Sequence, residues 1–405
     1  MNKFFTLLLF VGQFICYILS KCLFGFKKRD TDLWVFGEWF GNRCCDNCLY
    51  FANYLANKYP NLKLVWITCP GTNTSQLYST VLRVDMDSKD AIKKLKSAGV
   101  VMFVQGMEDV THKKLVYYSG AMVINMWHGV PWKKIGTDGR TRKLNYYYTK
   151  MYYKMFGAKY FLSISDEMTN IVSRAYEIKK SRCIRSGYPR NSLFYTQEKE
   201  KFRKKVIDYI SNTYNYSIPN SSHLVVYMPT FRDGKKEIFS FNNILNDENV
   251  KFLRYNNIVI LQKVHYVTSK RLGEKTENNY GRVFNIGGEF LSQELLAAAD
   301  ILVTDYSSCF FDFLLLNRPI IHFLYDYNFY ISEDRGLYYD KTDIACGDII
   351  EDENELLVAI KENLDNSNKN IELRQERIKK YMKYEDPNTC HYLYSEICKI
   401  LSQNG

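Results

Sequence analysis

Several motifs that mark common classes of enzyme are missing from this sequence of 405 residues. It has no GxxxxGKS or GxxxxGKT stretch, which excludes a P-loop, and no GxGxxG after a predicted strand, which excludes the usual dinucleotide fingerprint. The 6 histidines contain no HExxH pattern and no pair four residues apart, so nothing indicates a metallohydrolase. There is also no internal repeat and no low-complexity tract.

The 11 cysteines do not form a disulfide framework. Their number is odd, the chain is long, and most lie in apolar or mixed runs, as buried reduced thiols do in the cytosol. Cys44, Cys45 and Cys48 cluster without a second Cys/His pair at zinc-finger spacing. Asp85 and Asp87 resemble a metal-binding DxD, but Asp87 and Ser88 stand where a helix cap is expected. We predict no metal site.

The composition is that of a globular protein with a basic surplus. Apolar residues make up 46% and charged residues 24%, which excludes a disordered, collagenous or polytopic membrane protein. The formal net charge is +11, from 55 Lys and Arg against 44 Asp and Glu. Such a balance favours an anionic partner, which leaves nucleic acid, an anionic membrane surface or a phosphorylated substrate to be separated by motifs.

The first 30 residues form a separate apolar segment. Residues 4–20 read FFTLLLFVGQFICYILS and are followed by Lys21, Lys27, Lys28 and Arg29. The clean run is shorter than the roughly 20 residues of a membrane span, and no small-residue cleavage site of a secretory signal follows it. We predict a membrane-associating helix that lies in the interface, with its cations near anionic headgroups. A true span and a buried core helix are the alternatives.

The rest of the chain alternates short apolar strands with helical stretches, which predicts an α/β fold with parallel sheets covered by helices. A charged run and a polar loop near 196–222 separate two sets of strands. We predict two doubly wound, Rossmann-like domains facing a cleft, an acceptor-side domain over 31–215 and a donor-binding domain over 216–385. Residues 386–405 are expected to form a helix that packs back over the domains.

The first stretch with chemical potential is WHGVPWKKIGTD at 127–138, directly after the apolar strand MVINM. Ligands of open α/β sheets bind beyond the carboxyl ends of strands, so His128 stands where a cleft group would stand. A histidine near its ordinary pKa can take a proton from an attacking hydroxyl. The alternative, which strand position alone does not exclude, is a structural histidine bonded to its loop.

The second stretch, TDYSSCFFDF at 304–313, reads as strand, tight turn and helix. Asp305 ends the strand, and Ser307 and Ser308 begin the helix, where free backbone N–H groups favour an anion. An ordinary serine N-cap is the alternative. The third stretch joins two strand ends, PTFRD at 229–233 and KVH at 263–265. Arg232, Lys263 and His265 are candidate phosphate contacts there, with solvated loop charge as the alternative.

These stretches carry a resemblance to a known family. FGEWFGNRCCDN (36–47), WHGVPWKKIGTD, GYPRN (187–191), YMPTFR (227–232), KVH, TDYSSCFFDF and EDRGLYYD (333–340) occur in the order found in the CDP-glycerol glycerophosphotransferases, the teichoic acid primases and polymerases of Gram-positive bacteria. The matches spread over about residues 32–340, and the motifs around His128 and Ser307 are not generic signals of a nucleotide-binding fold. The sequence therefore resembles this family.

The resemblance implies a GT-B-like fold and the transfer of glycerol phosphate from CDP-glycerol to a hydroxyl of a lipid-linked saccharide acceptor, with release of CMP. His128 is then the base for the acceptor hydroxyl, and His265 steadies the leaving CMP. The remaining implied contacts fall into two sets. Donor phosphates would be bound by Arg232, Lys263, Asp305, Ser307, Ser308 and Arg335. The acceptor-side loop would contain Trp127, Gly129, Lys133, Lys134 and Asp138.

The resemblance also sets the expected partners and location. We expect CDP-glycerol or another CDP-polyol, a lipid-linked acceptor and an anionic membrane surface, but no nucleic acid, and a peripheral position on the cytoplasmic face of the cell membrane. No tightly bound cofactor is expected, and a Mg²⁺ ion loosely bound with the donor diphosphate is left open. Two other functions also stay open, a GT-B glycosyltransferase that uses a nucleotide sugar and a membrane-bound scaffold. Oligomeric state, polyol identity, the choice between priming and polymerising, and the choice between wall polymer and capsule are not predicted.

Overall fold

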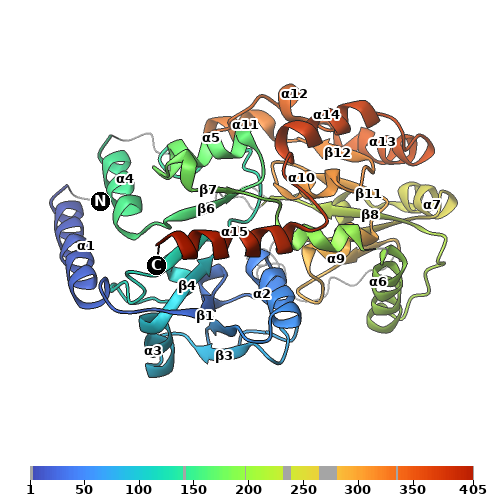
Figure 1. Cartoon of the computed structure of the whole chain (residues 1–405). Coiled ribbons are helices and arrows are strands. Elements are labelled where there is room, and N and C mark those ends of the chain that lie inside the picture. The colour runs from blue at the N-terminus through green and yellow to red at the C-terminus, as the bar shows by residue number, and fades with distance from the viewer. Residues whose placement is uncertain are drawn as a thin grey trace. The chain divides into compact units, whose positions relative to one another are not determined.

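The computed structural model describes residues 3–139, 143–196, 198–230, 239–263, 281–333 and 336–404 (Figure 1). The chain folds into two compact units. Unit 1 contains Met1–His128, Ile135–Ser192 and Lys383–Gly405, and unit 2 contains Gly129–Lys134 and Leu193–Met382. The chain therefore passes from one unit to the other four times, and two of these passages lie within the motif that begins at Trp127.

Unit 1 is built on a seven-stranded sheet in the order β3-β2-β1-β4-β5-β6-β7, in which every pair of neighbours is parallel. Its strands are β1 (Asp30–Phe36), β2 (Lys63–Thr68), β3 (Leu82–Asp85), β4 (Ala98–Phe103), β5 (Met122–Asn125), β6 (Tyr160–Ser163) and β7 (Cys183–Arg185). Its α-helices are α1 (Lys3–Phe24), α2 (Asn47–Lys58), α3 (Lys89–Ser97), α4 (Lys143–Phe156), α5 (Asp166–Ala175) and α15 (Thr389–Asn404). Single turns of 3₁₀ helix are η1 (Trp39–Gly41), η2 (Met107–Asp109) and η3 (Lys180–Arg182), and η4 (Pro189–Tyr195) leads into unit 2.

Unit 2 repeats the arrangement with a six-stranded parallel sheet in the order β10-β9-β8-β11-β12-β13. Its strands are β8 (His223–Met228), β9 (Ile258–Gln262), β10 (Val283–Asn285), β11 (Ile301–Thr304), β12 (Ile320–Phe323) and β13 (Asp348–Ile350). Its helices are α6 (Lys199–Tyr214), η5 (Phe241–Ile244), α7 (Asp247–Tyr255), α9 (Ser292–Ala298), α10 (Cys309–Leu314), α11 (Tyr327–Glu333), α12 (Lys341–Ile344), α13 (Glu353–Asp365) and α14 (Ile371–Tyr381).

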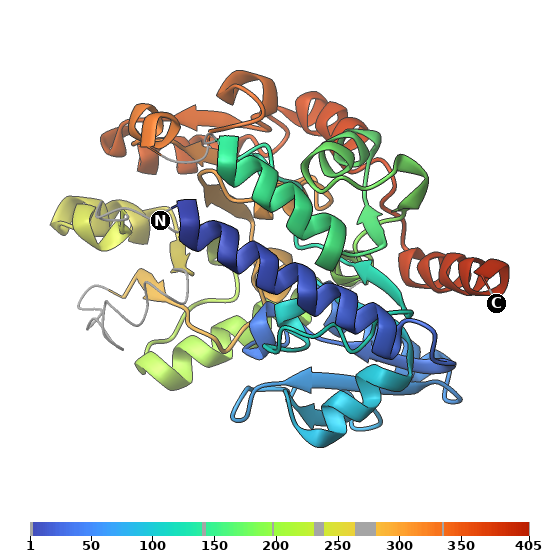
Figure 2. The same ribbon diagram turned by 90° about the vertical axis from the view of Figure 1, so that its left-hand side faces the viewer.

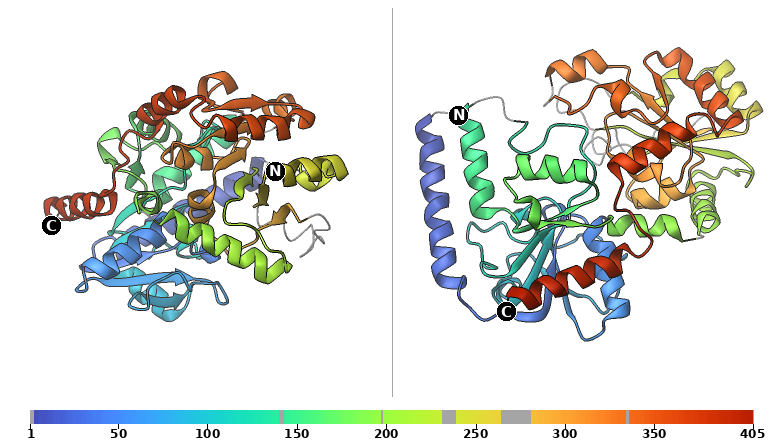
Figure 3. Two further views of the ribbon diagram at one scale, coloured as in Figure 1. Left: turned by 90° about the vertical axis from the view of Figure 1, so that its right-hand side faces the viewer. Right: turned by 45° about the horizontal axis from the view of Figure 1, so that its top comes forward.

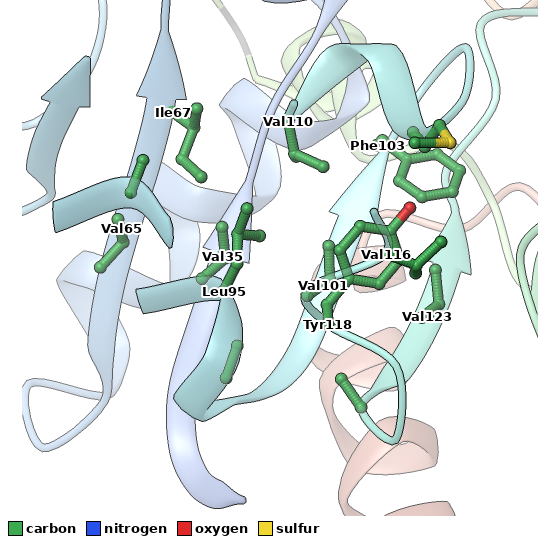
Figure 4. Packing of buried hydrophobic residues seen from close by; sticks show 14 of the residues in the cluster. Val35, Val65, Ile67, Leu95, Val101, Phe103, Val110, Val116, Tyr118 and Val123 are labelled. Atoms are coloured by element: carbon green, nitrogen blue, oxygen red, sulfur yellow. The ribbon is translucent and has the colours of Figure 1, made fainter. Parts of the chain in front are cut away.

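The cores follow from the apolar strands. Val35 in β1 pairs with Val65 in β2 and Val101 in β4, and all three side chains are fully buried. Helix α3 adds Leu95 to this layer, as Figure 4 shows. A second cluster around Val225, Ile260 and Val303 forms the core of unit 2. Central strands buried on both faces read as continuous apolar runs, which is why the sequence pattern locates them well.

The α/β prediction with two parallel, Rossmann-like sheets is confirmed. Three short strands were missed. All lie at the edge of a sheet, since β3 and β7 flank the sheet of unit 1 and β13 ends that of unit 2. They have three or four residues of mixed polarity, such as LRVD in β3, and only one residue of β3 is buried. Nothing in such a segment produces a clear alternating or continuous apolar pattern.

The predicted domain boundary was at 215, whereas in the structure the chain passes from unit 1 to unit 2 between Ser192 and Leu193. The charged run that looked like a linker forms α6, which belongs to unit 2. Its cations are paired with unit 2, since Lys205 Nζ lies 2.7 Å from Glu294 on α9 and Arg203 Nη1 lies 2.9 Å from Asp300. The chain returns to unit 1 at Lys383 and ends in α15, the red helix that ends at C in Figure 3. The rings of Tyr394 on α15 and Tyr59 stack 3.8 Å apart.

The first helix is held on unit 1 by one side only. Figure 2 shows α1 and α4 side by side, and Tyr148 on α4 donates to Gln13 Oε1 over 2.8 Å. Ser20 is fully buried and accepts a hydrogen bond from the backbone of Val116. In the described ranges, no helix combines the length and apolarity that crossing a bilayer requires.

Candidate functional site

Each sheet has a point at which the strand order reverses, and ligands of such sheets bind beyond the carboxyl ends of the strands there. In unit 1 this point lies between β1 and β4, and in unit 2 between β8 and β11. His128 follows β5, one strand away from the first of these points, whereas Asp305, Ser307 and Ser308 follow β11 directly. Each unit is described separately below.

In unit 1, the backbone after β5 turns sharply. The N–H of Met126 still pairs with Phe103 O on β4 at 2.8 Å, but Trp127 has a φ of 54°, which ends the strand. The Asn125 side chain accepts the N–H of Trp127 at 2.8 Å and holds this turn. Asn47 on α2 donates to the carbonyls of Met126 and Trp127. The position of His128 is therefore set by hydrogen bonds from both sides of the loop.

The His128 ring is held in one orientation and one tautomer. It lies between two indoles, with centroid distances of 4.2 Å to Trp127 and 5.3 Å to Trp39. Its Nδ1 is 3.3 Å from the carbonyl oxygen of Val104, which can only accept, so the proton is on Nδ1. The lone pair on Nε2 can therefore accept a hydrogen bond from another group, such as a hydroxyl.

The surroundings of His128 favour its neutral form. Burial lowers the pKa of His128 below its ordinary value of 6.5, and the charge of Arg190 acts in the same direction. The Asp46 carboxylate and the hydrogen bond to Val104 oppose that shift in part. A neutral imidazole at neutral pH is the form that can accept a proton, so the electrostatics agree with the predicted base.

Two buried carboxylates that sequence reasoning missed organise the loops around His128. Glu38, just after β1, accepts backbone N–H groups of Cys45, Asp46 and Leu49, and burial raises its pKa to about 8. Asp109 accepts the N–H groups of Phe40, Val104 and Gln105, and burial raises its pKa to about 6. Glu38 is a lone acid in an otherwise apolar stretch and Asp109 directly follows Glu108, and neither pattern identifies a carboxylate that organises a loop.

The motif around His128 is divided between the units. Gly129–Lys134 belongs to unit 2, and the backbone φ of 139° at Gly129 suits glycine at the start of this passage. Trp132 is buried in unit 2 against Tyr306, Phe310 and His322, and its Nε1 donates to Tyr339 O at 2.9 Å. The residues from Gly129 to Lys134 thus lie in the unit that we predicted for the donor.

Lys133 and Lys134 belong to this same anchored segment. The Lys133 ammonium lies 4.8 Å from the centroid of Tyr330, and Lys134 N donates to Gly336 O at 3.0 Å. Asp138 lies back in unit 1, where its carboxylate forms an ion pair with Arg174 at 2.8 Å. Of the five residues predicted for an acceptor-side loop, only Trp127 and Asp138 are therefore in unit 1.

In unit 2, Asp305 ties two strand ends together at the switch point. Its buried Oδ1 accepts both the N–H of Thr230, at 2.8 Å, and the Thr230 hydroxyl, at 2.6 Å. Thr230 follows β8, so Asp305 joins the residues that follow β8 to the end of β11. A carboxylate that holds a loop in this way is a positioning group.

Ser307 and Ser308 lie half-buried after β11. Ser307 Oγ is 3.5 Å from the N–H of Cys309, and Ser308 is the residue before α10 but makes no side-chain capping bond. The ordinary N-cap alternative is therefore not realised by Ser308. Helix α10 spans only Cys309–Leu314, so the hydroxyls and local N–H groups, rather than a long helix dipole, are what this turn offers an anion.

Lys263 is used to hold a loop. Its Nζ donates to the carbonyls of Phe290, at 2.6 Å, and Gly287, at 3.2 Å. Three predicted donor contacts, Arg232, His265 and Arg335, lie outside the described residues. The structure therefore places Lys263, Asp305, Ser307 and Ser308 in unit 2, the last three after β11 and Lys263 after β9, two strands away in the sheet. Their contacts with a donor stay a prediction.

The Asp85 and Asp87 pattern, which resembles a metal-binding DxD, has a structural role at its second residue. Ser88 caps α3 by accepting from Ala91 N, and Asp87 accepts from the Thr111 hydroxyl at 2.6 Å. Throughout the described part of the chain, no three His, Cys, Asp or Glu residues are grouped as ligands for a metal ion. Whether Mg²⁺ accompanies a donor stays a prediction.

Two parallel Rossmann-like units with ionisable and hydroxyl groups at their strand ends define an α/β protein of the GT-B class. The sequence itself is more specific than the fold. It matches the family described as CDP-Glycerol:Poly(glycerophosphate) glycerophosphotransferase over residues 21–399, and the chain belongs to this family.

Two of its curated relatives are named as enzymes of teichoic acid synthesis. The chain is 29% identical to a teichoic acid glycerol-phosphate transferase of Staphylococcus aureus (strain NCTC 8325 / PS 47), with 92% of this chain and 94% of that protein covered. It is also 29% identical to a teichoic acid poly(glycerol phosphate) polymerase of Bacillus spizizenii (strain ATCC 23059 / NRRL B-14472 / W23), with 58% of this chain and 60% of the polymerase covered.

Among solved structures, the wall teichoic acid polymerase TagF has a TM-score of 0.78 at 22% identity, covering 100% of this chain and 98% of the TagF chain. A TagF variant soaked with CDPG has a TM-score of 0.75. At this identity the likeness establishes the fold, and the family membership rests on the sequence match.

Proposed function

We propose that this chain transfers glycerol phosphate from CDP-glycerol to a hydroxyl of a lipid-linked acceptor, with release of CMP, in the synthesis of teichoic acid or a related capsule. The observation that carries the proposal is the setting of His128, whose Nδ1 lies 3.3 Å from Val104 O and whose pKa is lowered by burial, which suits Nε2 to accept a proton from a substrate hydroxyl. The family membership supplies the substrate class.

The proposed step needs one base and a site that stabilises the leaving group. Nε2 of His128 takes the proton of the acceptor hydroxyl as its oxygen attacks the phosphorus that carries the glycerol. A new P–O bond forms, the P–O bond to CMP breaks, and CMP leaves with the electron pair. Phosphoryl transfer depends mainly on alignment and on neutralising phosphate charge, so a single positioned base is sufficient on the acceptor side.

Donor binding is assigned to unit 2. The Ser307 and Ser308 hydroxyls follow β11 at the switch point, beside the turn that Asp305 holds through Thr230. Arg232, His265 and Arg335, which lie outside the described residues, complete the phosphate site that the family resemblance implies. Support also comes from the TagF variant that was soaked with CDPG.

The experiment is a donor screen with purified full-length protein. It is incubated with a lipid-linked disaccharide and, in separate reactions, CDP-glycerol, CDP-ribitol and UDP sugars, and the released nucleotide is measured. The proposal predicts CMP release from CDP-glycerol that depends on the acceptor. UDP release from a nucleotide sugar, with none from the CDP-polyols, would instead establish the alternative, a GT-B glycosyltransferase. A protein that releases neither nucleotide would support the scaffold.

We further propose that α1 lies in the membrane interface, on the cytoplasmic face of the cell membrane. Its far side carries apolar side chains that are 43–53% exposed on the helix, and Phe26 beyond the helix is 93% exposed. They are Val11, Phe14, Ile15, Ile18, Leu19, Leu23 and Phe26, and we call them the α1 stripe. Their spacing of three and four residues puts most of them on one face of the helix.

Cations gather beside the α1 stripe, in unit 1. A hollow of about 500 Å³ is lined by Lys27, Lys28, Lys89, Lys93 and Lys96, together with Ile92 and Ser97. An exposed apolar face next to a lysine cluster is the combination that binds the surface of an anionic bilayer. Membrane binding would bring the enzyme to a lipid-linked acceptor.

A further inference from the structure

Unit 1 contains a cavity of about 490 Å³ that the mechanism above does not use. It opens beyond the carboxyl ends of β4 and β5, at Phe103 and Asn125, and one of its walls is the inner side of α4. Its volume lies in the range of small-molecule sites, and its place beyond strand ends is where α/β sheets bind ligands.

The walls of the cavity are dominated by aromatic rings. These rings belong to Phe40, Phe103, Tyr148, Tyr152, Tyr153, Phe156, Phe161 and Tyr176. Several of them support one another, since the Tyr153 and Tyr176 centroids are 4.6 Å apart and those of Phe161 and Tyr176 are 5.5 Å apart. Rings that are fixed by their neighbours present flat apolar faces to a ligand at a low cost in conformational entropy.

A continuous series of ring contacts connects this wall to the catalytic base. Trp127 lies 5.4 Å from both Phe161 and Tyr176, and 4.2 Å from His128. On the other side of His128, Trp39 precedes the cavity residue Phe40 in the same turn of 3₁₀ helix. Trp127 therefore packs both on rings of the cavity wall and on the His128 ring, while His128 itself does not line the cavity.

The charge of the lining selects the kind of ligand. Among the described residues that line the cavity there is no Lys or Arg, and the single ionisable acid is Glu108, whose Oε1 accepts the Tyr152 hydroxyl at 2.6 Å. The Gln105 side-chain amide has no hydrogen-bond partner in the described ranges. The lining thus offers ring faces and an amide to a neutral polar molecule, and nothing to compensate a phosphate.

We propose that this cavity binds a neutral sugar ring of the saccharide acceptor and thereby directs transfer to a sugar hydroxyl rather than to the end of a polyanionic polyol phosphate chain. This inference rests on the proposed function, because it names the acceptor of the same reaction. Sugar C–H faces pack on aromatic rings, while an amide and a carboxylate fix the hydroxyls, as in other sites lined by rings with a few polar groups. A chain of phosphodiesters would bring uncompensated charge next to Glu108.

The test uses full-length protein, the variants Tyr153→Leu and Tyr176→Leu, and the matched control Tyr147→Leu. Tyr147 is also on α4 but is 55% exposed and does not line the cavity. Initial rates are measured with a soluble analogue of the lipid-linked disaccharide, and the Kd of CDP-glycerol is measured by calorimetry. We expect the acceptor KM to rise about five-fold in both cavity variants, with the donor Kd and the control unchanged, since a ring contact of this size contributes about 1 kcal/mol.

A second measurement separates failure of this inference from failure of the proposed function. Saturation-transfer NMR with the disaccharide and no donor should give binding to wild type that both cavity variants lose, at high and low salt alike, because the ligand is neutral. If wild type binds the disaccharide and the variants bind it equally well, with unchanged melting temperatures, the cavity assignment is wrong even when transfer occurs. Better turnover on an acceptor that already carries polyol phosphate units would also overturn it.

Discussion

Asp46 and Arg190 form a buried ion pair beside His128. Asp46 Oδ1 lies 2.7 Å from Arg190 Nη1, and the two side chains are only 8% and 5% exposed. Asp46 also accepts the indole N–H of Trp39, whose ring packs on His128. Arg190 comes from GYPRN and Asp46 from FGEWFGNRCCDN, so two motifs that lie far apart in the sequence meet beside His128.

Breaking the ion pair between Asp46 and Arg190 should lower the stability of the fold. Asp46→Asn would leave the buried guanidinium without its carboxylate, and we expect the free energy of unfolding to fall by about 3–5 kcal/mol, measured by urea denaturation. Arg190→Met in the Asp46→Asn background should recover part of the loss, because it removes the unpaired charge. A double variant that is less stable than Asp46→Asn alone would contradict this account of the pair.

The pH dependence of turnover should report the lowered pKa of His128. Protonation of the buried ring is unfavourable, so activity should persist below pH 6.5 and fall only as the pH drops through the lowered pKa. Asp46→Asn should move the acid limb of kcat/KM to still lower pH, since the charge of Asp46 favours the imidazolium. An acid limb above pH 6.5, or one that Asp46→Asn moves upward, would be incompatible with His128 as the base.

The hydroxyls after β11 should affect donor binding and not the base. Ser307→Ala combined with Ser308→Ala is expected to weaken CDP-glycerol binding by about 1–3 kcal/mol in calorimetry, through lost hydrogen bonds to phosphate. Ser332→Ala in the same unit serves as the control, because its hydroxyl only donates to Phe329 O on an exposed helix. Equal donor affinity in all three proteins would remove these serines from the site.

Vesicle flotation tests the α1 stripe. Ile15→Ser combined with Ile18→Ser changes exposed positions and keeps the packed side of α1, so the fold should survive while binding to anionic vesicles weakens. Raising the salt should weaken wild-type binding without abolishing it, since apolar burial and charge both contribute. Val358→Ser, at a 53% exposed position on α13, is the control. Wild-type protein that fails to float with anionic vesicles would refute the membrane proposal.

The sequence predicts buried strands well, but it predicts contacts between residues far apart in the chain poorly. Apolar strands such as Ile301–Thr304 can be recognised as continuous apolar runs, because a central parallel strand is buried on both faces. His128 was predicted as the base from its place after a strand, and that role stays a prediction. The role of Arg190 was not found, because an arginine in a polar loop reads as a solvent contact until the fold brings Asp46 to it. The same holds for Glu38 and Asp109, whose partners are backbone N–H groups.

The passage of Gly129–Lys134 into unit 2 could not be predicted either. Residues 127–138 read as one loop, and only tertiary packing of Trp132 under Tyr306 divides it. For Lys263, a cation after a strand suggested a phosphate contact, and the structure adds that its ammonium donates to two carbonyls of a loop, while the donor contact stays a prediction. Local patterns indicate which residues are polar, but not which partners they reach.

The most direct test of the central claim is mass spectrometry of the acceptor after incubation with CDP-glycerol, for wild type and His128→Ala side by side. Wild type should convert the lipid-linked disaccharide into a product heavier by glycerol phosphate. His128→Ala should form the same product about 10²–10⁴-fold more slowly, with the Kd of CDP-glycerol unchanged, because only the proton acceptor is lost. Undiminished product formation by His128→Ala, or a loss of donor affinity that explains its whole defect, would contradict the assignment of His128 as the base.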